Sequence, residues 1–204
     1  GMWEDAKEDG VQVHPYVMRK GITGEGLRVW TDLDRFEDVL LVPVMRMGAI
    51  VGMQKIYQDG EKLFVAGSDM RGGHYWLGSP DGSGVVAIGE GVATCDSVRK
   101  ATGWPVCVAF NAGNLKAVAE MVSKGWPDAT VVILADEDLW TWDHKHRKNK
   151  PDVLPDKDAP EWDEWRAAGW LKNAGRVAAE QAAAAIGGAQ VLGVAEGGDW
   201  NDLH

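Results

Sequence analysis

The sequence has few of the features that mark a secreted, disulfide-bonded or membrane protein. Cys95 and Cys107 are its only cysteines, and their spacing excludes a disulfide framework and a thiolate zinc site. No apolar run approaches the roughly 20 residues that a membrane-spanning helix needs, and the polar start does not resemble a signal peptide. We therefore expect a cytoplasmic protein that does not contact a membrane.

An excess of positive charge is also missing. The chain has 21 Lys and Arg against 31 Asp and Glu, which gives a net charge of −10. This balance excludes a protein that coats nucleic acid over a broad surface, but it is compatible with an enzyme that keeps its acids in a metal site. With 204 residues, of which 45% are hydrophobic, the chain can form one ordinary domain or two small ones.

Short apolar runs predict a small α+β lobe in the first part of the chain. Strands are expected at residues 39–44, 49–57 and 62–65. Asp59 and Gly60 are a hairpin turn signal before the last of these strands. A glycine-rich stretch at 79–84 then indicates a domain boundary, so the first lobe is expected to span 1–84.

From residue 85 onward, apolar strands alternate with helices. Strands are expected at 85–88, 106–110, 131–134 and 190–194, and helices at 91–102, 114–124 and 174–186. Continuous apolar strands separated by helices predict a mostly parallel sheet that is buried on both faces. The expected fold class is therefore α/β, with 85–204 as the second domain. Ligands on such sheets bind beyond the carboxyl ends of the strands.

Acidic residues follow three of these four strands. Glu90 follows the first strand, Asp136 and Asp138 follow the third, and Asp199 and Asp202 follow the last. Carboxylates that converge on one edge repel each other, and a hard divalent cation such as Mg²⁺ or Mn²⁺ neutralises them. Alternatively each acid only caps a helix, which is common for a single acid but uncommon for a whole set.

Four motifs occur in a fixed order: Glu90-Gly91, Asp136-Glu137-Asp138, Ala174-Gly175 with an alanine-rich helix, and Gly198-Asp199-Trp200-Asn201-Asp202-Leu203. This ordered set resembles the Toprim domain that primases, topoisomerases and some nucleases share. The last two motifs are similar to the phage and plasmid primase-helicase branch. The resemblance implies a Rossmann-like sheet over 85–204 with Glu90, Asp136 and Asp138 as catalytic residues. Metal ligands would be these three acids together with Asp199 and Asp202.

The first lobe is similar to the beginning of primase catalytic cores, in residues 16–22 and in its basic strands. In primases, basic residues of this subdomain line the channel for template and nucleotide. The matching positions are Arg19, Lys20, Lys55 and Lys62. Taken singly, each of them also fits an ordinary solvated side chain.

Residues 139–173 depart from the family pattern, in which only a residue or so separates the second aspartate from Ala-Gly. This insertion begins with a basic cluster, and we expect that cluster to contact a nucleic-acid backbone. Its members are Lys145, Arg147, Lys148 and Lys150. The alternative is a surface hairpin whose tryptophans pack on the body of the protein.

The resemblance implies metal-dependent synthesis of RNA primers on single-stranded DNA from ribonucleoside triphosphates. The chain is then the catalytic core of a mobile-element primase or primase-helicase, with a helicase domain or partner. Two alternatives remain open. A Toprim nuclease uses the same acids to cleave, and a non-catalytic nucleic-acid-binding module retains the acids as a vestigial site.

Overall fold

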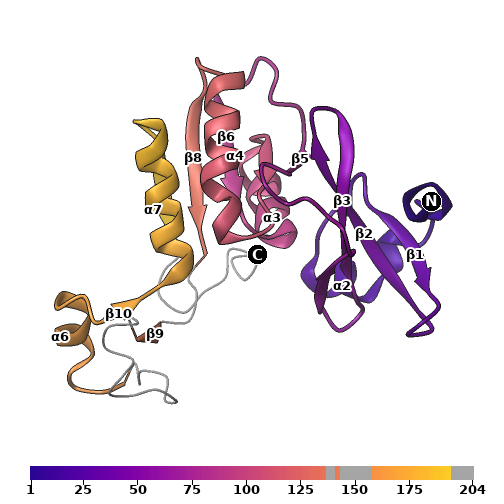
Figure 1. Cartoon of the computed structure of the whole chain (residues 1–204), viewed down its shortest axis with the longest axis horizontal. Coiled ribbons are helices and arrows are strands. Elements are labelled where there is room, and N and C mark those ends of the chain that lie inside the picture. Colours follow the sequence, from indigo (N-terminus) through magenta and orange to yellow (C-terminus); the bar gives the residue numbers. More distant parts are fainter. Residues whose placement is uncertain (137–140, 143–157, 194–204) are drawn as a thin grey trace.

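The computed structural model describes residues 1–136, 141–142 and 158–193 (Figure 1). These residues form two larger sheets, which lie side by side and are flanked by helices, and a small two-stranded sheet. In chain order the elements are α1 (Met2–Asp5), the 3-10 helix η1 (Val11–Val13), α2 (Pro15–Lys20), β1 (Arg28–Asp32), β2 (Glu37–Arg46), β3 (Ala49–Ile56), β4 (Lys62–Phe64), β5 (Tyr75–Leu77), β6 (Val85–Gly89), α3 (Val92–Thr102), β7 (Val106–Val108), α4 (Ala112–Gly125), β8 (Thr130–Ala135), β9 (Thr141–Trp142), α6 (Trp162–Ala167), β10 (Leu171–Lys172), α7 (Ala174–Ile186) and β11 (Gln190–Gly193).

The first sheet is antiparallel, in the order β1-β2-β3-β4, and both of its faces are partly covered. Along β2, alternate residues point to opposite faces. Leu40, Val42 and Val44 pack into a large core that the second sheet shares, whereas Val39 and Leu41 pack into a small core beneath α1. Since a core lies against each face, the middle of β2, residues 39–44, is an unbroken apolar run, as the sequence predicts.

The second sheet has five strands in the order β11-β8-β6-β7-β5. All neighbouring pairs in it are parallel, except that β5 runs antiparallel to β7. Helices α4 and α7 cover one face, and α3 with the first sheet covers the other. The predicted α/β class with a mostly parallel sheet is confirmed, and each of the four strands predicted after residue 84 is present within two residues.

Strand β5 lies before the boundary that the glycine-rich stretch predicts, but it pairs with the second sheet. Tyr75 is opposite Val108 and Leu77 is opposite Val106. The sequence does not predict this strand, since three residues carry too little periodicity to be recognised. A domain boundary near 84 stays a prediction.

The helices of the second part begin and end at residues that suit helix termini. The side chain of Asn173 accepts a hydrogen bond from the backbone N–H of Arg176 and so caps α7. Gly103 and Gly187 end α3 and α7 in the left-handed conformation, which costs glycine little. Among the described helices, none is long and apolar enough to cross a bilayer.

Polar contacts also join the two parts of the chain. Asn114 at the start of α4 is buried, and its Nδ2 donates to the carbonyl oxygens of Gly73 (2.7 Å) and Ala109 (2.9 Å). Its Oδ1 accepts from the backbone N–H of Gly72 at 2.8 Å. Because one side chain satisfies groups from both parts, the loop before β5 is fixed against α4.

The described ends of the insertion pair with each other. Strands β9 and β10 are antiparallel, with Trp142 opposite Leu171. Trp142 also contacts Trp165 of α6, with ring centroids 4.9 Å apart. The insertion therefore leaves and rejoins the body through a short two-stranded sheet. Its function, as a nucleic-acid contact or as a surface hairpin, stays a prediction.

Candidate functional site

The carboxyl edge of the parallel sheet brings Glu90 and Asp136 onto neighbouring strands. Strands β6 and β8 are parallel, and Ile88 is in register with Ile133. Glu90 and Asp136 follow these two residues closely at the same edge, where adjacent strands are about 4.8 Å apart. Thr94, in the first turn of α3, donates from Oγ1 to Oδ1 of Asp136 at 3.5 Å. The helix that begins after Glu90 therefore also touches Asp136.

The backbone at Gly89, the residue before Glu90, packs directly against the Cys95 side chain. A Cβ atom at Gly89 would lie 2.8 Å from the Cys95 Sγ and 3.1 Å from a methyl group of Leu134. Only glycine fits this position without displacing the core beneath the site. Burial, and next the negative charge of Asp136, raise the pKa of the Cys95 thiol, whereas Lys62 lowers it. Asp136 and Lys62 therefore both lie within electrostatic reach of one buried side chain.

Lys62 reaches the site from the first sheet. Its Nζ atom lies 3.8 Å from the position that a Cβ of Gly91 would take, directly after Glu90. The Lys62 Nζ is also 5.9 Å from the centroid of the buried Tyr16 ring, and the Arg19 guanidinium carbon is 5.8 Å from the same centroid. Two of the four basic residues predicted for a channel are thus grouped around Tyr16, and one of them, Lys62, also lies beside Gly91.

The other two basic residues are placed differently. Lys20 is half-buried and is the last residue of α2, next to Arg19. Lys55 lies on the opposite face of its sheet from Lys62, because Lys62 pairs with Ile56 and Lys55 with Leu63. Its Nζ atom is 2.7 Å from Oδ2 of the buried Asp32. The structure therefore does not bring Lys55 together with Arg19 and Lys62.

The predicted site extends beyond the described residues. Asp138, Asp199, Asp202 and the basic cluster of the insertion (Lys145, Arg147, Lys148 and Lys150) all lie outside them. Within the described ranges, no three His, Cys, Asp or Glu residues are grouped as a metal site. Glu90 and Asp136 are thus the part of the predicted ligand set that the structure describes.

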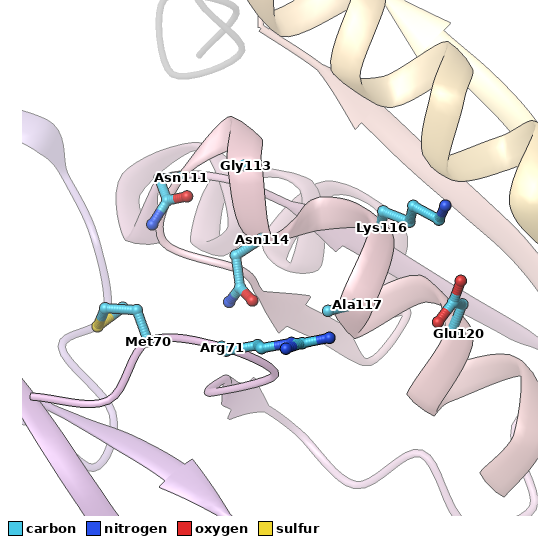
Figure 2. A pocket seen from close by; sticks show the side chains of 8 residues that line it. All are labelled: Met70, Arg71, Asn111, Gly113, Asn114, Lys116, Ala117 and Glu120. Atoms are coloured by element: carbon cyan, nitrogen blue, oxygen red, sulfur yellow. The ribbon is translucent and has the colours of Figure 1, made fainter.

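A pocket of about 640 Å³ lies beside this edge, and the sequence does not predict it (Figure 2). Its lining comes from the loop before β5 and from the first half of α4: Met70, Arg71, Asn111, Gly113, Asn114, Lys116, Ala117 and Glu120. Figure 2 shows the Arg71 side chain extended along α4 toward Ala117 and Glu120. In the sequence, Asn111-Ala112-Gly113-Asn114 follows an expected strand, but nothing local in the sequence reveals that Arg71 lies opposite it.

Two aromatic rings meet between the acids and this pocket. Phe64 of β4 and Phe110, which follows β7, have ring centroids 6.0 Å apart at an interplanar angle of 76°. Phe110 is buried and has a φ of 70°, which is a rare backbone conformation for a bulky residue. Strained residues of this kind are concentrated at functional sites.

Two neighbouring parallel strands are each followed by an acid, and a lysine from the first sheet lies beside them. This arrangement is that of an α/β protein with its site at the carboxyl edge of the sheet. A family model described as a Toprim domain matches residues 85–204. The chain therefore belongs to the Toprim family, and the resemblance predicted from its motifs is confirmed.

Two relatives are both called DNA primase TraC of Escherichia coli. One is 40% identical over 89 residues, which are 42% of this chain and 8% of the relative. The other is 34% identical over 131 residues, which are 62% of this chain and 9% of the relative. The chain thus spans less than a tenth of the length of either protein.

Two solved structures are similar to most of the chain at 12% identity. The structure of the DnaG catalytic core has a TM-score of 0.49 and covers 97% of this chain and 59% of its own. A DNA primase domain from Pseudomonas aeruginosa has a TM-score of 0.46 and covers 100% of this chain and 57% of its own.

Proposed function

We propose that this chain is the catalytic core of a primase that synthesises RNA primers on single-stranded DNA. The observation that carries the proposal is the convergence of Glu90, Asp136 and Lys62 at the carboxyl edge of the parallel sheet. The names of the relatives support it, because both are DNA primases.

The donor atoms at this edge fit a hard divalent cation. Glu90 and Asp136 offer carboxylate oxygens, and the thiol of Cys95 is buried in the core. Oxygen ligands favour Mg²⁺ or Mn²⁺ over softer metals. We propose that Glu90, Asp136 and Asp138 hold the ions and that Asp199 and Asp202 assist them. Bound ions of this kind neutralise the charge of a triphosphate during phosphoryl transfer.

In the proposed reaction, the 3′-oxygen of the growing primer forms a bond to the α-phosphorus of a ribonucleoside triphosphate. The bond from that phosphorus to the leaving pyrophosphate breaks. The proton of the 3′-hydroxyl passes to the Glu90 carboxylate, or to water where Glu90 acts as a ligand. Lys62 places its positive charge beside Gly91, where it stabilises the phosphate oxygens.

The remaining basic residues are proposed to bind the template. Arg19 and Lys20 are the last two residues of α2, and Arg19 approaches the same Tyr16 ring as Lys62. The basic cluster of the insertion follows Asp138 in the chain. A helicase domain or partner and a cytoplasmic location remain predictions from the sequence.

Primer synthesis with labelled ribonucleotides, single-stranded DNA and Mg²⁺ or Mn²⁺ tests the proposal. Asp136→Asn should abolish synthesis, because a metal ligand loses its charge, while the free energy of unfolding stays within about 0.5 kcal/mol of wild type. Asp128→Asn is a matched control, since Asp128 precedes β8 at the opposite end of the strand from Asp136. Synthesis by Asp136→Asn at the wild-type rate would remove Asp136 from the mechanism.

The same reactions distinguish the alternatives. A Toprim nuclease would shorten labelled DNA and form no primer, and that activity would also depend on Asp136. A non-catalytic module would bind DNA and do neither. Cleavage without synthesis by the wild-type chain would replace the primase proposal with the nuclease.

A further inference from the structure

The functional groups of the carboxyl edge follow one another in a line, because the strands that carry them are neighbours. The sheet order places Asp136 after β8, Glu90 after the adjacent β6, and Phe110 and Asn111 after β7. Successive strands are about 4.8 Å apart. The edge therefore leads from the two carboxylates to an aromatic pair and then to the pocket that Asn111 lines.

Strand β4 of the first sheet lies along this edge, and its residues follow the same order, from the end of β6 to the end of β7. Lys62 and Phe64 are two residues apart, so they share one face of the strand and are separated by about 7 Å along it. Lys62 lies at Gly91, after β6, and Phe64 lies against Phe110, after β7. A positive charge near the acids is thus followed by an aromatic ring one strand further along.

The Phe64 ring is suited to hold a flat ligand. The residue keeps 37% of its surface exposed, although it lies beside the apolar Phe110 ring. The interplanar angle of 76° shows that the two rings do not stack on each other. A base can stack on any aromatic side chain, whatever the sequence of the strand, because every base has a π-face.

The pocket beyond Phe64 is suited to hold a phosphate. Arg71 and Lys116 are both exposed and both line it, against a single acid, Glu120. In the described part of the chain, neither cation forms an ion pair, whereas Arg46, which hydrogen-bonds to the Arg71 carbonyl, is paired with Asp69. The two cations near Phe64 are therefore available to a ligand, in a protein whose net charge is −10.

We propose that a single-stranded nucleic acid leaves the acidic site along this edge, with one base stacked on Phe64 and a backbone phosphate bound by Arg71 and Lys116. This inference rests on the proposed function, to which it adds the path of the strand and three residues that bind it. A nucleobase on Phe64 has two sources, the strand or the incoming ribonucleoside triphosphate, and the experiment separates them.

Fluorescence anisotropy with a labelled oligothymidylate, measured over a range of salt concentrations, tests both contacts. Phe64→Leu should weaken binding by roughly 5- to 150-fold with an unchanged salt slope, since stacking on a base carries no charge. Phe64→Tyr should restore it. Arg71→Gln combined with Lys116→Gln should flatten the slope of log affinity against log salt by about 0.7, the value for one phosphate contact on a single strand.

Lys124→Gln is the matched control for the pocket. It removes the same charge from the same helix, eight residues beyond Lys116 and therefore about 12 Å further along. Its salt slope should equal that of the wild type. An equal loss of slope in Lys124→Gln and in the double variant would overturn the pocket as a specific site, and wild-type binding by Phe64→Leu would overturn the stacking contact.

Titration with a ribonucleoside triphosphate and Mg²⁺ separates the two sources of the base. The proposal requires that Phe64→Leu leaves triphosphate binding unchanged, and a loss confined to the triphosphate would overturn it. Wild-type primer synthesis serves as the independent readout of the proposed function. If the wild type synthesises primers but the variants bind DNA as the wild type does, only the proposed path is refuted. If the variants bind DNA differently but the wild type synthesises no primer, only the proposed primase function is refuted.

Discussion

Lys55 and Lys62 belong to neighbouring strands of one sheet, yet the structure gives them opposite surroundings. Lys62 faces the second sheet and ends beside the candidate site, where it is exposed. Lys55 faces the other way, and its side chain is only 17% exposed in the pair with Asp32. The comparison shows that a match to a family position does not by itself give a lysine its role. The face of the sheet on which the lysine lies decides whether it can reach the site.

The Lys55 side has the properties of a structural network. Asp32 accepts from the Lys55 ammonium at 2.7 Å, from the Tyr57 hydroxyl at 2.8 Å and from the backbone N–H of Asp34 at 3.1 Å. The hydrogen bonds from Lys55 and Tyr57 lower the pKa of Asp32 to about 2. Lys55 Nζ also lies 4.9 Å from the centroid of the Trp30 ring. Asp32 thus accepts hydrogen bonds from three donors, and we infer that this face stabilises the sheet.

The largest effect on stability should come from Lys55→Met. The change leaves the buried Asp32 carboxylate without its cation, and losing one partner of a buried pair costs about 3 kcal/mol. Urea denaturation measures this cost. Adding Asp32→Asn to Lys55→Met should restore part of the stability, because no buried charge is then left alone. A loss below 1 kcal/mol would contradict a structural role for Lys55.

The next effect is the pH dependence of the stability difference between wild type and Lys55→Met. Because the folded pKa of Asp32 is depressed from 3.8 to about 2, its contribution to stability is complete above about pH 5 and is lost as the pH falls through 2. Lys55→Met removes the main cause of the depression. The difference in unfolding free energy between wild type and Lys55→Met should therefore shrink from pH 5 to pH 2. A difference that stays constant over this range would mean that Asp32 does not titrate as proposed.

Arg46→Gln should have a smaller effect, although its ion pair has the same length as that of Lys55. The Arg46–Asp69 distance is also 2.7 Å, but the two side chains are 37% and 53% exposed. Exposed ion pairs contribute less than about 1 kcal/mol, since water screens them. Urea denaturation of Arg46→Gln and Lys55→Met side by side separates burial from distance as the cause of stability.

Lys62→Met should change stability least and function most. Lys62 is exposed, so the free energy of unfolding should stay within about 0.5 kcal/mol of wild type. Primer synthesis should fall by about 100-fold, because the positive charge that we propose stabilises the phosphates is removed. Equal loss of activity per folded molecule in Lys55→Met and Lys62→Met would break the distinction between the two faces.

The sequence could predict most of the second part of the fold. Its three inner strands, β6, β7 and β8, are buried, so each contains a continuous apolar run, and the helices between them are long enough to be recognised. The same pattern places Glu90 and Asp136 after strands, and the parallel order brings them to one edge. In a parallel sheet all carboxyl ends of the strands lie at one edge, so the location of Glu90 and Asp136 follows from the strand pattern alone.

The division between Lys55 and Lys62 could not be predicted, because it depends on one residue of register. A two-residue turn at Asp59 and Gly60 would pair Lys62 with Tyr57, which would put both lysines on the same face. In the structure the turn is longer, and Lys62 pairs with Ile56 instead. A shift of one residue moves every side chain of a strand to the opposite face.

The pocket could not be predicted for a related reason. Arg71 lies in the loop between β4 and β5, which has no periodic pattern, and it lines one pocket with Lys116 because Asn114 fixes that loop. Contacts between residues more than 40 positions apart leave no local signal. Loop residues are therefore the part of the site that needs a structure.

The core that both sheets share has a consequence for how the chain folds. Ile22 and Leu40 from the first part belong to one cluster with Ala93 and Leu134 from the second, although these residues lie far apart in the sequence. A protein with such a high contact order should fold slowly and unfold in a single cooperative transition. Proteolytic nicking between the sheets should thus release no stable half, and calorimetry should record one heat-absorption peak.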